Sequence, residues 1–297
     1  MSGILIGQSA VNVLLLTGVL TIAALGFSIV WGVMSIINLV HGAAIMLGAY
    51  VTFIAFTFAG IDPFLTIPIS MVVLFGLGYL LQRNIINYVM RAPMLTTFLL
   101  TFGLEIIIIN LAQFFFKSDL RAITTSYSGS SLTLYSDPAA NASIEVPYIK
   151  LGALFVALLL TLLTHLLMSR TRLGRAIRST GMDKDAAQLT GARISNVYAL
   201  TFAISAGLAG AAGSLIAMTQ SFQPGFGSTY TLYAFVIVVL GGLGSVPAVF
   251  LGALAFSLIT VLTGLWQPGL TQAAAFALLV IMLVVRPSGI AGKAFYQ

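Results

Sequence analysis

Apolar residues fill most of this chain in long stretches, separated by short polar or glycine-rich breaks. Each stretch comes close to the roughly 20 residues that cross the hydrocarbon core of a bilayer as a helix. The pattern predicts an all-α integral membrane protein in which residues 1–297 form one transmembrane domain. Nine segments are predicted, near residues 9–30, 34–59, 64–82, 93–116, 147–169, 196–219, 231–246, 247–266 and 269–285.

Two stretches contain residues that interrupt a membrane helix, at 33–42 (VMSIINLVHG) and at 239–247 (VLGGLGSVP). Irregular backbone at membrane depth is tolerated only inside protein or beside a cavity. We therefore expect broken or re-entrant helices there, and eight spans with one re-entrant piece, or ten spans, stay open beside nine. The motif Leu-Gly-Ala follows both breaks, at 47–49 and 251–253. Such a pattern is typical of the two structural halves of a transporter, and it also arises by chance.

Composition excludes a soluble domain with a charged surface, because charged residues make up 7% of the chain, hydrophobic residues 59%, and the mean hydropathy is +1.08. The net charge of +6 does not indicate nucleic acid, since the basic residues gather at the ends of apolar stretches. Lys and Arg are in excess in cytoplasmic loops, where they meet lipid headgroups. No cysteine is present, which excludes disulfides and thiol-ligated metals.

Charge distribution also predicts the topology. Arg83, the segment 170–195 and Arg286 mark cytoplasmic positions. The segment Lys117–Lys150 balances three bases against three acids and is rich in Ser, Thr and Tyr, so we expect an external, extended or turn-rich loop around 117–146. Crossing parity then favours nine segments with the N-terminus outside.

The basic segment 170–195 is the main polar island of the chain. It holds six of the 13 Lys and Arg residues and two of the seven acids. Thr180 to Asp183 fits a capping box and Gly191 fits a helix-ending position, which predicts a short helix from about residue 181 to residue 190. Arg172, Arg175 and Arg178 precede it at three-residue spacing, as on one face of a helix that continues the fifth span. From charge alone, a role in fixing topology would explain these arginines.

Small residues recur at four-residue spacing in segment 196–219, in the pairs Ala203/Gly207, Ala206/Gly210 and Ala209/Gly213. Such a face lets another helix approach closely. Packing within the chain is the simpler interpretation, and a contact between subunits is the alternative.

Few polar side chains lie within the predicted spans. Asn38 and His41 are one helical turn apart, and each needs a partner if it is buried in the membrane. They either stabilise a broken helix or line a substrate pathway. Glu105 is the one acid well inside a predicted span, and an unpaired carboxylate there is costly. We take Asn38, His41, Gly42 and Glu105 as the hypothetical pathway residues.

The core of the basic segment, Asp-Ala-Ala-x3-Gly at 185–191, resembles the Glu-Ala-Ala-x3-Gly loop with which permeases of ABC importers dock a short coupling helix onto their ATPase. The likeness extends over nearly the whole chain and in the same order. It is closest to the shorter of the two paired permeases of branched-chain amino acid ABC importers, through segments 32–50, 174–178, 186–191, 199–202 and 239–247. One departure is that no Ile-x-Leu-Pro follows Gly191.

The resemblance implies an all-helical permease in a bacterial inner membrane, importing branched-chain or related amino acids. It implies four partners: a second similar permease, two cytoplasmic ATPase subunits and a periplasmic binding protein. ATP would be hydrolysed by the ATPases, because this chain has no phosphate-binding P-loop. Coupling to them is assigned to Arg175, Arg178, Asp185, Ala186, Ala187 and Gly191.

Other functions stay as alternatives. Permeases of urea and short-amide ABC importers have similar motifs, so the substrate is the least determined feature. A stand-alone secondary transporter needs coupling groups in several spans, and only Glu105 fits that role. No pair of catalytic groups, cofactor motif or metal-ligand cluster is visible among two His and seven acidic residues, so we do not expect an enzyme.

Overall fold

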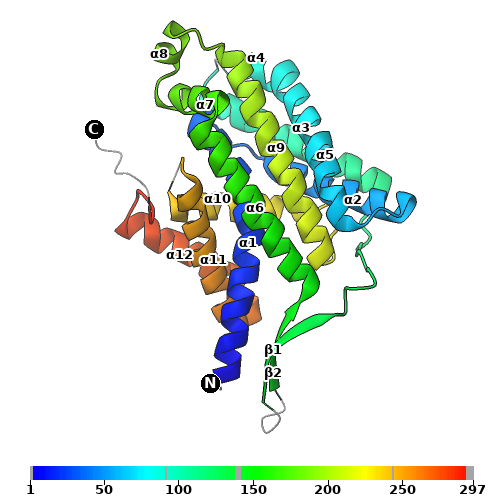
Figure 1. The fold of residues 1–297 in the computed structure, drawn as a ribbon. Helices are drawn as coiled ribbons and strands as arrows, with labels where there is room; N and C mark the ends of the chain where they lie inside the picture. The colour runs from blue at the N-terminus through cyan, green and yellow to red at the C-terminus, as the bar shows by residue number, and fades with distance from the viewer. Residues whose placement is uncertain (1–2, 91, 138–141, 243, 292–297) are drawn as a thin grey trace.

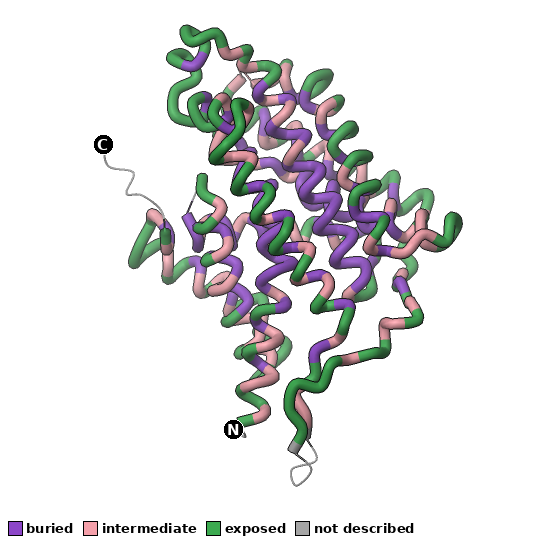
Figure 2. Tube along the Cα trace, in the orientation of Figure 1, coloured by how far each residue is buried: buried purple, intermediate pink, exposed green. Residues whose placement is uncertain are grey.

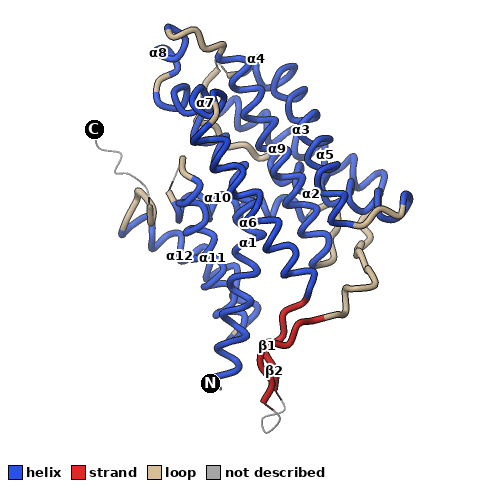
Figure 3. Tube along the Cα trace, viewed as in Figure 1, coloured by secondary structure: helices blue, strands red, loops and turns tan. Residues whose placement is uncertain are grey.

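The computed structural model describes the chain except for residues 1–2, 91, 138–141, 243 and 292–297 (Figure 1). The described part is a bundle of helices with one small hairpin, as Figure 3 shows by colour. In chain order the elements are α1 (Gly3–Met34), α2 (Val40–Ala59), α3 (Pro63–Leu81), a π-helical turn (Gln82–Ile86), α4 (Asn87–Val89), α5 (Met94–Phe116), β1 (Ser131–Asp137), β2 (Ala142–Pro147), α6 (Tyr148–Arg170), α7 (Arg172–Met182), α8 (Lys184–Leu189), α9 (Ile194–Thr219), α10 (Phe226–Gly241), α11 (Val246–Trp266), a 3-10 turn (Pro268–Leu270) and α12 (Thr271–Val285).

The nine predicted segments are confirmed as nine apolar helices within the described residues. Eight of them are long and apolar enough to cross a membrane, if α12 is counted with the 3-10 turn before it (18 residues, Pro268–Val285), and α10, with 16 residues, is shorter. At the two breaks, α2 starts at Val40 rather than near residue 34 and α10 ends at Gly241 rather than near residue 246; α1 also starts earlier than predicted, at Gly3. The chain is thus a multi-pass membrane protein with broken helices.

Helices α1 and α9 form the centre of the bundle, where Figure 2 shows nearly continuous burial. Small residues on α9 make this packing close. A Cβ added to Gly210 would lie 2.9 Å from the carbonyl oxygen of Ser70, and one on Gly213 would overlap the carbonyl oxygen of Ile45. The small-residue face of segment 196–219 therefore packs within the chain, against α2 and α3.

The two ends of the bundle agree with the predicted topology. Gln8, in the first helix, bonds the β2 backbone: its Nε2 donates to the carbonyl of Glu145 (3.0 Å) and its Oε1 accepts from the amide of Glu145 (2.8 Å). Helices α7 and α8 lie at the opposite end, which we call the cytoplasmic end because it carries the basic segment (Figure 1). The start of α1 and the hairpin β1–β2 thus share the end opposite the basic segment, which is the arrangement that the predicted topology requires.

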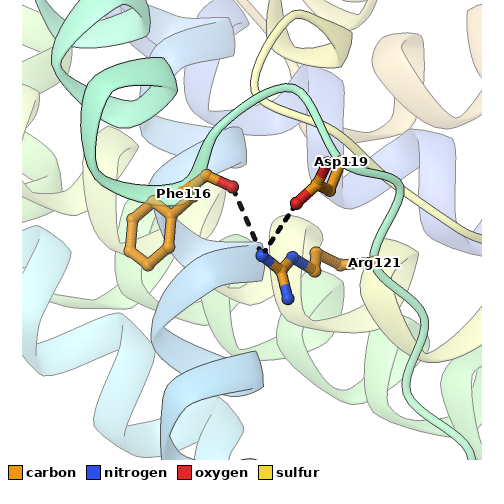
Figure 4. Close-up of polar contacts among 3 residues, drawn as sticks. All are labelled: Phe116, Asp119 and Arg121. Carbon is orange, nitrogen blue, oxygen red and sulfur yellow. Dashed lines mark hydrogen bonds and ion pairs between the residues drawn. The ribbon is translucent and has the colours of Figure 1, made fainter.

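The predicted extended segment contains the antiparallel hairpin β1–β2, and two contacts anchor the chain before it. Arg121 donates from Nη2 to the carbonyl of Phe116 (3.3 Å) and to Oδ2 of Asp119 (3.5 Å) (Figure 4). The Tyr127 hydroxyl donates to Oδ2 of Asp62 (2.7 Å), the residue that caps α3. Burial, together with this carboxylate, raises the pKa of Tyr127 to about 12.

Candidate functional site

The first break separates α1 from α2 at residues 35–39. Ser35 ends α1 in the left-handed region (φ 53°), with its amide donating to the carbonyl of Trp31 (3.0 Å). A positive φ is unusual for a residue other than glycine, and it turns the chain sharply. At the N-cap of α2, Leu39 provides no side-chain acceptor. The broken helix predicted at 33–42 is therefore confirmed, and α2 begins without a side-chain cap.

Hydroxyl groups from two neighbouring helices hold this break. Thr101 of α5 donates to the carbonyl of Ile37 (3.3 Å). Thr231 of α10 contacts the carbonyl of Leu39 (3.4 Å) and accepts from the amide of Gly42 (2.9 Å). The irregular backbone is thus enclosed by protein, as a membrane protein requires.

His41 and Asn38 are both buried at this break, with exposed fractions of 1% and 3%. Nε2 of His41 lies 2.7 Å from the carbonyl oxygen of Ala23 in α1. A carbonyl only accepts, so Nε2 carries the hydrogen, and in a neutral imidazole Nδ1 is left as an acceptor. Within the described part of the chain, Nδ1 of His41 and Oδ1 of Asn38 have no hydrogen-bond partner.

Ser205 of α9 lies near His41. Its hydroxyl is also buried without a partner among the described residues. A Cβ added to Gly26 of α1 would lie 3.0 Å from both Cε1 of His41 and Oγ of Ser205, which places these two side chains side by side over Gly26. An unsatisfied buried polar group costs about 1–3 kcal/mol. Three of them at one break require a reason, such as a ligand or a second conformation.

Asn38, His41 and Ser205 all line one cavity of about 180 Å³ between α2, α3, α5 and α9. The other lining residues are apolar and come mainly from α2 and α3. The unpaired polar atoms of these three residues are buried behind the cavity wall, so the accessible wall is almost wholly apolar.

The other two predicted pathway residues lie outside this cavity wall. Gly42 packs against α10, since a Cβ there would overlap the carbonyl oxygen of Gly227. Glu105 is buried on α5 next to Ser228 at the start of α10, and its Oε1 has no partner in the described structure. The structure thus places Asn38 and His41 at the same cavity. Gly42 and Glu105 lie instead against the start of α10. Ser205 was missed, because its sequence signal was only a hydroxyl within the small-residue face of α9.

The second break, between α10 and α11, is built from glycines. Gly242 and Gly244 have φ values of 100° and 86°, which favour glycine. Ser245 then caps α11, its hydroxyl accepting from the amide of Ala248 (3.3 Å). The break predicted at 239–247 is confirmed.

In the basic segment the predicted capping box is wrong. Thr180 is buried inside α7, and the helix that follows starts at Lys184 because Asp183 caps it. The Asp183 carboxylate accepts from the amides of Asp185 (2.9 Å) and Ala186 (3.0 Å). An extended backbone at Asp183 (φ −155°, ψ 111°) allows this geometry, whereas Thr180 has no free helix end to cap.

Gly191 ends α8 as predicted. Its φ is 89°, its amide donates to the carbonyl of Gln188 (2.9 Å), and the amide of Ala192 donates to the carbonyl of Ala187 (3.1 Å). These two bonds form a Schellman motif, which needs a residue with positive φ at this position.

The arginines do not lie on a continuation of the fifth span, so that prediction is wrong too. Helix α6 ends at Arg170, and Thr171 interrupts it with an extended backbone, its hydroxyl accepting from the amide of Gly174 (3.0 Å). Arg175 is exposed, while Arg178 donates from Nη1 to the carbonyl of Met168. Arg178 therefore ties α7 to α6, and Arg175 is free to meet a partner.

The last residue of α7 and the last residue of α8 are apolar and exposed. Met182 and Leu189 have exposed fractions of 89% and 91%. Asp185 and Ala186 are exposed as well, and Ala187 is the one buried residue of α8. Met182 and Leu189 thus lie exposed on either side of this short helix, within the basic segment.

Comparisons with known proteins agree with these features. The family described as branched-chain amino acid transport system / permease component matches residues 9–285. The high-affinity branched-chain amino acid transport system permease protein BraD of Pseudomonas aeruginosa is 29% identical over 296 residues, which covers 96% of this chain and 95% of BraD. LivH of Escherichia coli K12, named for the same transport system, is 28% identical with the same coverage. LivM of that organism is 26% identical over 306 residues, covering 96% of this chain and 71% of LivM.

No solved structure matches the chain. The family match nevertheless spans most of the sequence and includes both helix breaks and the helices α7 and α8. The chain belongs to the family of permease components of branched-chain amino acid transport systems.

Proposed function

We propose that this chain is the permease subunit of an ATP-driven importer of branched-chain or related amino acids in a bacterial inner membrane. It works with a second permease of similar sequence, two ATPase subunits at the cytoplasmic end and a periplasmic binding protein. Support comes from the family membership and from relatives that are named for branched-chain amino acid transport. The similarity to LivM as well as LivH favours a pair of related permeases.

The observation that carries the proposal is the position of α8. It protrudes from the cytoplasmic end of the bundle (Figure 1), with Leu189 almost fully exposed. Its two ends are fixed by the Asp183 cap and the Gly191 Schellman motif, so a six-residue helix stays formed without other support. A rigid element with exposed apolar groups is suited to dock in a groove of the ATPase.

A force on α8 has a direct route to the first break. Helix α7, which carries α8, packs against the last turn of α1: a Cβ on Gly181 would lie 2.8 Å from the carbonyl oxygen of Gly32. Gly32 is three residues before Ser35, where α1 ends. Movement of α7 would therefore displace the end of α1 and the start of α2, where Asn38 and His41 lie. Opening at this break is the step that we assign to ATP-driven transport.

Substitution in α8 tests the coupling. Leu189→Asp places a charge on the exposed apolar contact without changing the buried face of α8. In the complete transporter reconstituted in vesicles, ATP hydrolysis stimulated by the loaded binding protein should fall at least about tenfold, as expected when a buried interface residue is replaced by a charge. The permease should remain folded in the membrane.

Ser195→Asp provides a matched control, since it adds the same charge at an exposed position outside α8. An acid near the N-terminus of α9 is compatible with the helix dipole. Stimulation should stay near normal in this variant. Full stimulation in correctly assembled Leu189→Asp complexes would contradict the proposed docking.

A further inference from the structure

A second and larger cavity lies at the cytoplasmic end of the bundle. Helices α6 and α11 both pack on α1 and barely touch each other, so α1 lies between them (Figure 1). Helix α7 crosses the cytoplasmic end of α1, where a Cβ on Gly181 would lie 2.8 Å from the carbonyl oxygen of Gly32. These four helices, with residues 244–247 at the start of α11, enclose about 440 Å³. The cavity lies near the level at which α6 ends, at Arg170.

The polar side chains of this cavity can all donate hydrogen bonds. They are Ser28 of α1, His165 and Ser169 of α6, Arg178 of α7 and Ser245 before α11. No Asp or Glu is among the lining residues in the described part of the chain. Arg178 uses Nη1 for the carbonyl of Met168, which leaves most of its five N–H groups for another acceptor. A site with one guanidinium, several donors and no carboxylate favours an anion.

Ser28 is the polar residue deepest in this cavity. The three other hydroxyls of α1, those of Ser9, Thr17 and Thr21, each donate to the carbonyl four residues earlier, at 2.6–2.7 Å. Ser28 is 3% exposed, and its hydroxyl has no hydrogen-bond partner within the described structure. Unlike the hydroxyl of Ser205, it is not sealed off from solvent, because it retains access to the cavity. An unpartnered buried donor that opens into a cavity indicates a ligand there.

Most of the cavity wall is nevertheless apolar, with Ile29 of α1, Met168 of α6 and Val246 of α11 among the lining residues. The surfaces beside it are apolar as well, since Leu162 of α6 and Leu251 of α11 are 53% and 38% exposed. In a membrane such surfaces meet acyl chains. A small soluble anion would leave the apolar wall unfilled, whereas an anion that carries an acyl chain would cover both parts of the cavity.

We propose that this cavity binds one anionic phospholipid of the cytoplasmic leaflet. Its phosphate accepts hydrogen bonds from Arg178, which can bond phosphate through two parallel N–H groups. Ser28, one helical turn deeper than Gly32, donates to an ester carbonyl, and an acyl chain lies on the apolar wall. Basic pockets between membrane helices on the cytoplasmic side hold such headgroups in other proteins.

The lipid would touch two moving parts of the transporter at once. It contacts α7, which carries α8, and residues 244–247 of the second break. The lipid thus joins the helix that we expect to meet the ATPase to the break that the C-terminal segment closes. The inference goes beyond the proposed function, because it does not depend on which solute is carried.

Lipid binding to the complete transporter in detergent tests the site by native mass spectrometry. The probes are dioleoylphosphatidylglycerol and dioleoylphosphatidylcholine, which share acyl chains and differ in net charge. Phosphatidylglycerol should bind at least about tenfold more tightly, the effect of about 1.4 kcal/mol. Equal affinity for both lipids would overturn the inference. Displacement of phosphatidylglycerol by millimolar inorganic phosphate would assign the cavity to a soluble anion instead and would overturn it too.

Substitution of Arg178 locates the phosphate. Arg178→Gln should weaken phosphatidylglycerol binding about tenfold, the effect of one hydrogen bond to a charged group. Arg175→Gln is the matched control, because it removes the same charge from an exposed position of α7 that does not line the cavity. Binding in this control should change less than about twofold. Equal shifts in the two variants would show general attraction to a basic surface and would contradict the site.

Ser28→Ala is a second variant, which leaves the bond between Arg178 and α6 in place. It should weaken phosphatidylglycerol binding about three- to fivefold, the effect of one neutral hydrogen bond. Thermal stability in phosphatidylcholine should not fall, since the hydroxyl that is removed has no partner in the described structure. A purely structural role predicts the reverse, with lower stability and unchanged lipid affinity.

The absence of cysteine from the sequence allows the position to be checked. Ser169→Cys places a thiol at the cavity, and Ser179→Cys places one on α7 outside it. Both serines are exposed and donate to the carbonyl three residues earlier, so they are a matched pair. At a phosphatidylglycerol concentration about five times Kd, N-ethylmaleimide should modify Ser169→Cys about sixfold more slowly, the factor 1 + [L]/Kd, and Ser179→Cys at an unchanged rate. If phosphatidylcholine slows Ser169→Cys equally, a segment of the ATPase or any lipid fills the cavity, and the inference is wrong.

Discussion

The two helix breaks look alike in the sequence and differ in how their polar groups are satisfied. At the second break, the carbonyls that end α10 accept hydrogen bonds from the C-terminal segment: the amide of Ile290 donates to Leu240 (2.8 Å) and the amide of Ala291 to Gly241 (2.9 Å). The following helix is capped by Ser245. This break uses glycines and closes its hydrogen bonds.

At the first break, hydroxyls of Thr101 and Thr231 satisfy backbone groups, but the turn residue is not glycine and buried side chains keep unpaired atoms. Its turn residue is Ser35, at a φ that favours glycine, its second helix has no side-chain cap, and Asn38 and His41 keep unpaired polar atoms in the described structure. A region that retains strain and unsatisfied groups is typical of a functional site. The comparison therefore separates a structural break from one that we expect to move or to bind solute.

The largest effect should come from the helix crossings that support both breaks. A side chain on Gly42 would overlap the carbonyl of Gly227, and one on Gly252 would overlap the carbonyl of Ile237. Gly42→Val and Gly252→Val should each cost about 3 kcal/mol or more, because overpacking against backbone cannot relax. Folded protein in the membrane, measured by size-exclusion profile, should be largely lost. Gly76→Val, where no atom lies within 4 Å, is the control that should fold.

Removing the His41 side chain should separate function from stability. His41→Ala deletes the bond to the Ala23 carbonyl and the unpaired Nδ1 together. We expect leucine uptake by the complete transporter to fall at least about tenfold, because His41 joins α2 to the Ala23 carbonyl of α1 at the break that we expect to move. Basal ATP hydrolysis and assembly should stay near normal. Unchanged uptake would return His41 to a structural role.

Removal of the polar side chain that caps α11 at the second break should lower stability and leave leucine uptake unchanged. Ser245→Ala removes the N-cap of α11, which costs about 1 kcal/mol. The melting temperature should drop by a few degrees while leucine uptake in vesicles at lower temperature is kept. A loss of uptake without a loss of stability would show that the second break is functional as well.

The smallest predicted effect is a slight gain in thermal stability. Ser35→Gly relieves a left-handed residue, for which a side chain costs about 1 kcal/mol, although glycine also raises the entropy of the unfolded chain. We expect thermal stability to be equal or slightly higher, and the same substitution to alter transport rate, since it changes the turn that α7 acts on. A clear loss of stability would show that Ser35 is not strained.

Some of this structure was predictable because it depends on local chemistry. Polar and glycine residues inside apolar stretches revealed both breaks, and Gly191 revealed the end of α8. The start of α8 was not predictable locally, because Thr180 and Asp183 are both good N-caps, and burial of Thr180 in α7 decides between them. The interruption at Thr171 has a similar cause, since only the packed helix shows that Gly174 lies against the end of α6.

The cavity at the first break could not be predicted from the sequence, for a different reason. Its polar groups come from the first break and from α9, about 165 residues later, and they meet only when α1 leaves space at Gly26. No periodicity links such positions, so the sequence does not distinguish Ser205 from the other small residues of segment 196–219.

The short length of α10 has a consequence for the bilayer itself. Sixteen helical residues extend about 24 Å, less than the roughly 30 Å hydrocarbon core. Its last turn is largely buried in protein, and the amides of Ile290 and Ala291 bond the carbonyls of Leu240 and Gly241 that end it. Residues 290–291 thus provide the hydrogen bonds that the headgroup region of the bilayer provides to a helix of full length.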